Sequence, residues 1–139
     1  MKRILTGAFV TIFLVGITFF SWAGGKKESS LIIEIDDLQR IIENEQIMIL
    51  DIRDELSYLQ GHIPGAILVP LSDVNLMAED ILEAKITIVT YCSCPAEESS
   101  IDAAFRLRAK GAAKIHVLKG GYPAWENAGF DVAVGPDPM

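Results

Sequence analysis

Short apolar runs alternate with segments of helical spacing along this chain, and that alternation limits the folds open to it. Each run has the length of a strand and is mostly apolar, which is typical of strands covered on both faces of a sheet. The runs are Leu31–Ile35, Ile47–Leu50, Ala66–Val69, Ile86–Tyr91 and Ile115–Leu118. Strands that alternate with helices predict an α/β fold with a parallel sheet flanked by helices on both faces.

Helical segments fill the intervals between these runs. Asp36 is a plausible N-cap for the first helix and Ser72 for the third, because both side chains accept hydrogen bonds from orphan backbone N–H groups. Apolar side chains recur at helical spacing, and glycines follow two of the segments. The expected helices are Asp36–Glu43, Glu55–Gln60, a segment after Ser72, Ser99–Ala109 and a short helix around Trp125.

Residues 1–23 differ from the rest of the chain. Lys2 and Arg3 precede an uncharged run of 17 residues, Ile4–Phe20, and small residues at positions 21 and 23 suit a signal peptidase. We expect a signal peptide cleaved after Ala23, with no membrane span left after cleavage. The alternative is an uncleaved anchor, since the run is at the lower limit for spanning a bilayer. Either reading predicts an exported domain, periplasmic or secreted, with a linker at 24–30 and the domain at 31–136.

The charge balance excludes one class of function. The chain has 12 Lys and Arg residues against 19 Asp and Glu, a net charge of −7. Loss of residues 1–23 removes Lys2 and Arg3, which leaves 10 basic residues against 19 acidic ones, or −9. Nucleic-acid binding needs a basic surface that displaces counterions from phosphates, so no nucleic-acid partner is expected. Two cysteines are too few for a disulfide framework.

Both cysteines follow the clearest strand of the chain. Ligands of open parallel sheets bind at the carboxyl ends of the strands, and the strand ending at Tyr91 leads into a loop and then a helix. Backbone N–H groups of such a loop, with the positive end of the helix, stabilise a thiolate or a persulfide. The predicted reactive loop consists of Cys92, Ser93, Cys94, Pro95, Ala96, Glu97 and Glu98.

Three stretches of the chain together resemble the rhodanese-like (sulfurtransferase) domain family. The order and spacing of the stretches carry the resemblance, which extends over almost the whole predicted domain. They are Asp51-Ile-Arg53 followed by Tyr58-Leu-Gln-Gly61-His62-Ile-Pro64-Gly65-Ala66, then Tyr91-Cys92, and then Leu118-Lys-Gly120-Gly121-Tyr-Pro-Ala-Trp125 with Gly129.

The resemblance implies a five-stranded parallel sheet and a cysteine that carries transferable sulfur. A thiolate would attack a sulfur donor, become a persulfide, and pass the outer sulfur to a nucleophilic acceptor. The implied partners are a small sulfur-containing substrate, cyanide or a partner-protein thiol, and no metal or organic cofactor is implied. Metal binding is also disfavoured because two thiols lack third and fourth soft ligands.

The loop departs from the family pattern in its charge. Typical sulfurtransferases of the family close this loop with an Arg; counted from Cys92, Glu97 stands in that place, with Glu98 next to it. No Lys or Arg lies between Cys92 and Arg106. Two carboxylates would repel a dianion, so thiosulfate is a doubtful donor. Alternatively, both glutamates lie in the first turn of the helix and face water.

The position of the reactive thiol is open. Cys92 directly follows the strand, as the family's catalytic Cys does, whereas an ungapped count back from Gly111 arrives at Cys94. We favour Cys92 as the sulfur carrier, with Cys94 assisting or resolving. The closely spaced pair also permits a strained, reducible disulfide, so the alternative function is a non-catalytic or redox-sensing dithiol module on the same fold. A related phosphatase would need an Arg where Glu98 stands and is rejected.

The remaining polar residues are predicted to support the scaffold. Asp51 and Arg53 should form a charge-assisted pair at a strand end. His62 is expected to brace a turn rather than to act as a base. His116 is expected to face solvent, and Trp125 to pack in the core.

Overall fold

The computed structural model describes residues 30–136, so the predicted signal peptide and nearly all of the predicted linker lie outside the described residues. The chain order alternates strands and helices throughout. The elements are β1 (Ile32–Ile33), α1 (Ile35–Asn44), β2 (Ile47–Asp51), α2 (Glu55–Gln60), β3 (Ile67–Leu68), α3 (Val74–Glu83), β4 (Thr87–Tyr91), α4 (Glu98–Ala109), β5 (Ile115–Leu118) and α5 (Gly121–Asn127).

All five strands form one parallel sheet in the order β1-β5-β4-β2-β3. The central strand β4 pairs with its neighbour β2 over the full length of both, from Ile47 opposite Thr87 to Asp51 opposite Tyr91. Their carboxyl ends therefore lie side by side, and both Asp51 and Tyr91 are completely buried. The five-stranded parallel sheet expected from the sequence is confirmed.

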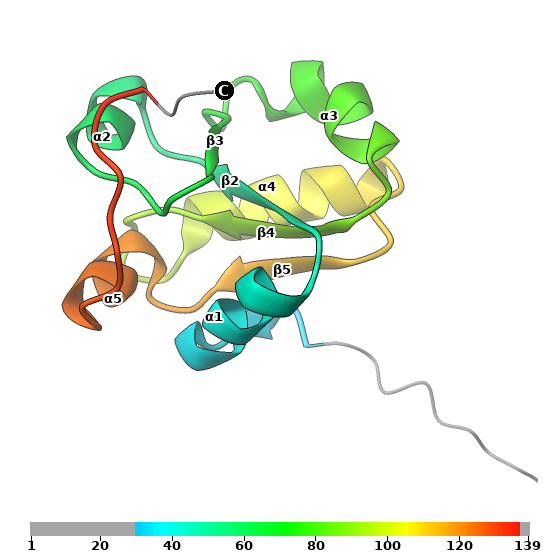
Figure 1. The fold of residues 1–139 in the computed structure, drawn as a ribbon. Helices are drawn as coiled ribbons and strands as arrows, with labels where there is room; N and C mark the ends of the chain where they lie inside the picture. Colours follow the sequence, from blue (N-terminus) through cyan, green and yellow to red (C-terminus); the bar gives the residue numbers. More distant parts are fainter. Residues whose placement is uncertain (1–29, 137–139) are drawn as a thin grey trace, which may run out of the picture.

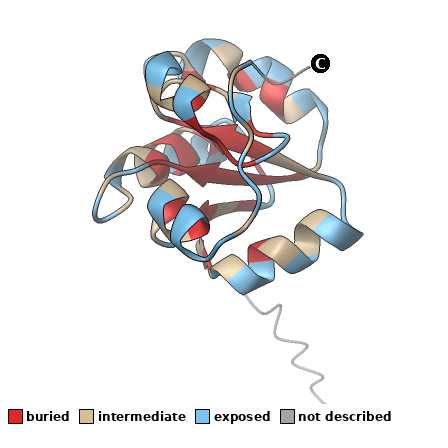
Figure 2. Cartoon of the chain, turned by 60° about the vertical axis from the view of Figure 1, so that its left-hand side comes forward, coloured by how far each residue is buried: buried red, intermediate tan, exposed pale blue. Residues whose placement is uncertain are grey.

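Helices cover both faces of the sheet and divide the core into two clusters (Figure 1). One cluster joins α3 and α4 to the sheet, with Ala78 and Leu107 at its centre. The other joins α1 and α5 through Leu38 and Trp125. Figure 2 shows the strands buried almost throughout, whereas the helices expose their outer faces. Trp125 is a core residue, as predicted, with 3% of its surface exposed.

Two predicted helix starts are wrong by one or two residues. The helix expected from Asp36 begins at Ile35, because Ile35 packs against the cluster of Ile33 and Leu38 and the chain must turn as soon as β1 ends. Ser72 does not cap α3: its hydroxyl donates instead to the Asp73 carboxylate, and Asp73 precedes the helix without a side-chain cap bond.

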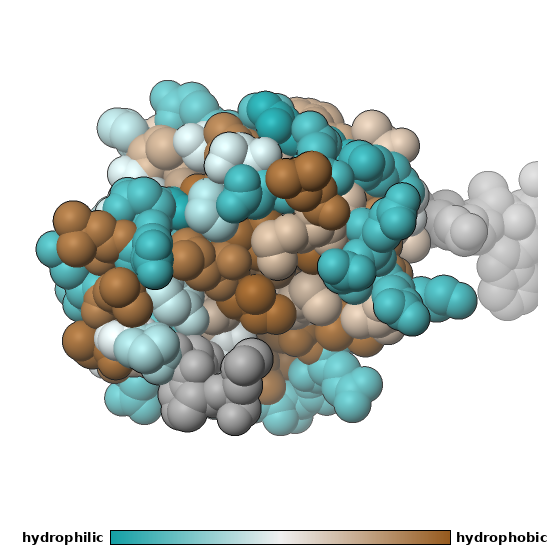
Figure 3. All heavy atoms as spheres, turned by 90° about the horizontal axis from the view of Figure 1, so that it is seen from above, coloured by the Kyte–Doolittle hydropathy of each residue, from teal (hydrophilic) through white to brown (hydrophobic). Residues whose placement is uncertain are grey.

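Some large hydrophobic side chains remain on the surface. Figure 3 shows hydrophobic groups in the middle of one face, bordered by hydrophilic groups. Leu56, Ile67 and Leu76 are exposed on α2, β3 and α3. Scattered apolar exposure is ordinary for a domain of this size and does not by itself mark a site. Within residues 30–136, no helix has both the length and the apolar character needed to cross a membrane.

The helix that follows the reactive loop provides a test of the packing. Leu107→Ala should lower the free energy of unfolding by about 2–5 kcal/mol, because Leu107 is fully buried and the substitution leaves a cavity. Urea denaturation followed by circular dichroism measures the change. Phe105→Ala is the matched control on the same helix: its side chain is 54% exposed, and a loss above about 1 kcal/mol there, or below it for Leu107→Ala, contradicts this packing.

Candidate active site around the Cys92–Glu97 loop

A buried charged cluster joins the carboxyl ends of β2 and β4. The Asp51 carboxylate accepts hydrogen bonds from Arg53 Nε at 2.9 Å and from the Tyr91 hydroxyl at 2.6 Å. Arg53 Nη2 lies 2.5 Å from the same carboxylate and also donates to the Gly61 carbonyl at 2.7 Å. The Tyr91 hydroxyl accepts the Ile63 N–H at 3.2 Å. The predicted Asp51–Arg53 pair is therefore present, and it connects both strand ends to the turn before β3.

The Tyr91 hydroxyl and the Arg53 guanidinium both stay protonated at physiological pH. Burial and the neighbouring Asp51 charge raise the pKa of Tyr91, so its hydroxyl stays protonated and donates. Burial disfavours the Arg53 cation, but the bonds to Asp51 outweigh that cost and raise the pKa of Arg53 overall. The guanidinium also lies 4.2 Å from the centre of the Tyr122 ring. Arg53 is thus already paired, and a substrate anion would have to compete with Asp51 for it.

His62 braces the turn, as predicted, and contributes nothing to the reactive loop. It is fully buried, its ring stacks on Tyr58 at 3.8 Å, and its Nδ1 lies 2.9 Å from the Tyr58 carbonyl oxygen. His116, expected to face solvent, is half-buried instead, because its Nδ1 lies 2.8 Å from the Ser30 carbonyl oxygen beside β1.

The reactive loop runs from Cys92 to Glu97, between β4 and α4. Pro95 and Ala96 form a turn in which the Glu97 N–H donates to the Cys94 carbonyl at 3.2 Å. Proline suits the second position of such a turn because its φ is already set. The turn reverses the chain directly before α4, so the side chains of the first helical turn lie beside the loop.

Two hydrogen bonds attach the loop to the turn between β5 and α5. The Tyr122 N–H donates to the Cys92 carbonyl at 2.9 Å, and the Gly120 N–H donates to Glu97 Oε1 at 2.6 Å. Gly121 allows this close approach. Its φ is +54°, and a Cβ atom there would lie 2.0 Å from the Cys92 carbonyl oxygen. The Gly120-Gly121 pair therefore positions the reactive loop through the backbone.

The prediction that both glutamates face water from the first helical turn is wrong for Glu97. Glu97 precedes α4 in a left-handed conformation, with φ +54°, and its carboxylate is bound by the Gly120 N–H. That charge-assisted bond offsets the cost of the backbone conformation. Glu98 is the first residue of α4 and is exposed, as predicted. The Glu97 carboxylate is thus held by the backbone after β5, whereas Glu98 is exposed.

Cys94 is the accessible thiol. It is half-buried, and its sulfur lies 3.2 Å from the Ser99 hydroxyl at the start of α4. In the thiol form, the Cys94 S–H donates to the Ser99 hydroxyl. In the thiolate form, the Ser99 hydroxyl and amide donate to the sulfur instead, and with a contribution from Cys92 they lower the pKa of Cys94, while burial and the nearby Glu98 charge act in the opposite direction. A thiolate at this helix start is favoured by the same groups.

Cys92 is the buried thiol, with 2% of its surface exposed. Its sulfur lies 3.5 Å from the Ser100 hydroxyl and 3.4 Å from the Cys94 backbone N, which donates to it. Burial raises the pKa of Cys92, so the thiol stays protonated at neutral pH. Both cysteines are free thiols.

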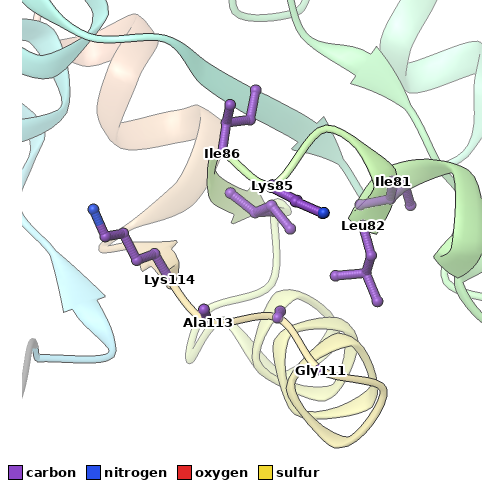
Figure 4. Close-up of a pocket in the computed structure, with 9 residues that line it drawn as sticks. Ile81, Leu82, Lys85, Ile86, Gly111, Ala113 and Lys114 are labelled. Atoms are coloured by element: carbon purple, nitrogen blue, oxygen red, sulfur yellow. The ribbon is translucent and has the colours of Figure 1, made fainter.

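A polar pocket of about 330 Å³ borders the loop. It offers hydrogen-bonding groups and one exposed carboxylate to a molecule that approaches the loop at Ser93. Its lining residues are Arg53, Ser57, Gln60, Gly61, Ser93, Tyr122 and Glu126. A second, apolar pocket of about 280 Å³ is lined by Ile81, Ile86 and Ala113, among others, at the other end of β4 (Figure 4). It lies too far along the strand to take part in chemistry at the cysteines.

The sequence predicts no role for Ser99 or Ser100, although both contact the cysteine sulfurs from the first turn of α4. Their place directly after the predicted loop is the local signal for these contacts. The bond from Gly120 to Glu97 joins residues far apart in the chain and left no local signal. Pro95 and Ala96 shape the turn. Among residues 30–136, no three His, Cys, Asp or Glu side chains are grouped so as to hold a metal ion.

A thiol held at the carboxyl edge of a parallel α/β sheet, beside the N-terminus of the next helix, defines a class of cysteine-dependent domain. Comparison with known proteins identifies which one. Residues 34–128 match the Rhodanese-like domain family, and the chain belongs to it.

Named relatives agree with this assignment. The chain is 36% identical to thiosulfate sulfurtransferase GlpE of Pseudoalteromonas translucida over 99 residues, which is 69% of this chain and 89% of that protein. It is 29% identical to a sulfurtransferase of Allochromatium vinosum, over 68% of this chain and 85% of that protein. The structure superposes on the BH2092 protein of Bacillus halodurans with a TM-score of 0.68 and 31% identity, over 76% and 77% of the two chains. Family and relatives support sulfurtransferase activity in general.

The two thiols should differ in reactivity with pH. At neutral pH iodoacetamide should label Cys94 and leave Cys92 unlabelled, because only the thiolate reacts and the Cys94 thiolate forms at lower pH than that of a free cysteine, about 8.5. Ser99→Ala should shift the midpoint of Cys94 labelling to higher pH, and Ser72→Ala, on another element, should not. Peptide mass spectrometry across pH measures both; faster labelling of Cys92 would contradict this account.

Proposed function

We propose that the protein transfers sulfane sulfur through a persulfide formed on Cys94. The observation that carries the proposal is the position of the Cys94 sulfur, half-exposed beside the hydroxyl and amide of Ser99 at the start of α4. These groups stabilise a thiolate, and they would stabilise the terminal sulfur of a persulfide for the same reason. Membership of the rhodanese-like family supports the reaction type.

The reaction has two steps. The Cys94 thiolate attacks the sulfane sulfur of a donor, the donor's bond to that sulfur breaks, and the donor leaves with the bonding electrons. An acceptor nucleophile then attacks the terminal sulfur of the persulfide, and Cys94 leaves as a thiolate. The acceptor is a small thiol, cyanide or the thiol of a partner protein.

Cys94 replaces Cys92 as the proposed carrier. The sequence favoured Cys92 because it directly follows the strand, and it allowed Cys94 on the count from Gly111. Cys92 is buried with a raised pKa, which hinders both attack on an external donor and formation of the thiolate. Cys94 is half-exposed and its pKa is lowered, so a donor can reach it and its thiolate forms more readily.

The donor is expected to be neutral or singly charged rather than thiosulfate. The loop residues 92–98 contain no cation, and the buried Arg53 guanidinium is held by Asp51. Glu97 is occupied by Gly120, but Glu98 remains exposed beside the reactive thiol. At about 7 Å and an effective dielectric constant near 20, one such charge opposes another by roughly 2 kcal/mol before salt screening.

The second candidate function is a redox-sensing dithiol module, which two free thiols in one loop favour, with the Cys94 backbone N–H donating to the Cys92 sulfur. It predicts reversible disulfide formation with no uptake of sulfur from any donor. For either function, the leader at 1–23 supports the proposal that the domain acts outside the cytoplasm, in a periplasm or in the medium.

Sulfur loading of single-cysteine variants tests the carrier. Cys92→Ser should gain the mass of one sulfur atom after incubation with a low-molecular-weight persulfide, and Cys94→Ser should not. Intact-mass spectrometry before and after treatment with a reductant measures the gain. Loading of Cys94→Ser alone would return the carrier role to Cys92, and loading of neither variant would refute sulfur transfer.

The charge of Glu98 should limit thiosulfate use. Glu98→Gln should raise kcat/KM for thiosulfate by about fivefold at low salt, which corresponds to roughly 1 kcal/mol of repulsion after screening. The gain should shrink at high salt and be absent with an uncharged donor. Glu79→Gln, an exposed glutamate on α3, is the matched control. Equal gains in both variants, or none in either, would contradict a local effect of Glu98.

A further inference from the structure

Cys92 is a nucleophile that sulfur transfer through Cys94 does not use. It is buried beneath the loop, and its sulfur lies 3.4 Å from the backbone N of Cys94. The Cys92 sulfur also lies 3.5 Å from the Ser100 hydroxyl. The Ser100 hydroxyl donates its own proton to the Glu97 carbonyl at 3.0 Å, so the Cys92 thiol is the donor in the contact between them. Cys92 is thus held as a thiol next to the residue that carries the sulfur.

We propose that Cys92 resolves the persulfide on Cys94 and that the protein thereby releases sulfide, ending each cycle as a Cys92–Cys94 disulfide. This inference rests on the proposed function, because it requires a persulfide on Cys94. It assigns the buried thiol a reaction of its own and makes sulfide a product alongside transferred sulfur.

The step balances without an added oxidant. The Cys92 sulfur attacks the inner sulfur of the Cys94 persulfide, the bond between the inner and terminal sulfurs breaks, and the terminal sulfur leaves as hydrosulfide. The terminal sulfur of the persulfide anion takes up the proton of the Cys92 thiol as it leaves, so one hydrosulfide is the product. The sulfane sulfur is reduced, and the two cysteine sulfurs are oxidised to the disulfide.

Burial restricts Cys92 to this one reaction partner. External donors and oxidants cannot reach a side chain that is 2% exposed, whereas Cys94 lies two positions along the chain and its backbone N is 3.4 Å from the Cys92 sulfur. Proximity of this kind raises the local concentration of the attacking group far above that of a free thiol. The low thiolate fraction of Cys92 slows the attack and leaves time for an acceptor to take the sulfur first.

The product disulfide closes a small ring of three residues, Cys92, Ser93 and Cys94. Such rings are strained, and strained disulfides are readily reduced by thiol exchange. Cys94 is the half-exposed sulfur, so an external dithiol reductant would attack there and restore both thiols. The cycle therefore consumes one sulfane donor and one dithiol and yields one sulfide.

Sulfide release in the absence of an acceptor tests the inference. The wild-type chain is loaded anaerobically with a low-molecular-weight persulfide, freed of donor, and followed by a sulfide assay and by intact mass. We expect one sulfide per loaded chain, with loss of two hydrogens relative to the reduced protein. Cys92→Ser and Cys92→Ala should keep the added sulfur and release sulfide at least about tenfold more slowly until a dithiol is added.

The outcomes separate this inference from the proposed function. If the wild-type chain keeps its persulfide as long as the Cys92 variants do, resolution by Cys92 is wrong and sulfur transfer stands. If neither the wild-type chain nor a Cys92 variant takes up sulfur and no sulfide appears, the proposed function itself is wrong. The wild-type measurement decides the question even where a substitution at the buried position impairs folding.

Discussion

The Asp51 carboxylate is the interaction on which the position of the reactive loop depends. It ends β2 inside the core and binds Arg53 from its own strand end and Tyr91 from the end of β4. Through Arg53 and Tyr91 it also fixes Gly61 and Ile63, the turn that leads to β3. Loss of one member would leave an unpaired buried charge, which is far more costly than the pair is stabilising. Since Cys92 follows Tyr91 directly, this cluster sets where the first thiol emerges from the sheet.

A second constraint determines how the loop meets its neighbours. Gly120 and Gly121 bring the backbone after β5 against the loop, where it binds the Cys92 carbonyl and the Glu97 carboxylate. Glu97, whose charge opposes anionic donors, therefore also holds the loop in place. Stabilisation of a thiolate comes instead from the start of α4, where Ser99 binds Cys94. The groups that lower the pKa of Cys94 are hydrogen-bonding groups rather than a cation.

Much of the fold could be predicted from local pattern. The strand Ile115–Leu118 and the short helix Glu55–Gln60 have the predicted bounds, because apolar runs and closing glycines are local signals. Helix starts were less predictable: α1 begins at Ile35 and not after Asp36, since packing against Ile33 and Leu38 outweighs the preference of an aspartate for a cap position. His116 was expected to face solvent from its alternation, but the contact with Ser30 beside β1 covers part of it.

The sequence by itself determined the class of fold and placed both cysteines in the loop for which we propose the chemistry. Those properties follow from residue type and from spacing along the chain. Only the tertiary structure decided which cysteine is accessible, that Glu97 is bound and Glu98 free, and that serines of α4 contact the thiols. The reason is physical: burial and hydrogen bonding depend on segments far apart in sequence, as when Gly120 binds Glu97 across the edge of the sheet. The difference between Cys92 and Cys94 arises from which side of one loop faces the core.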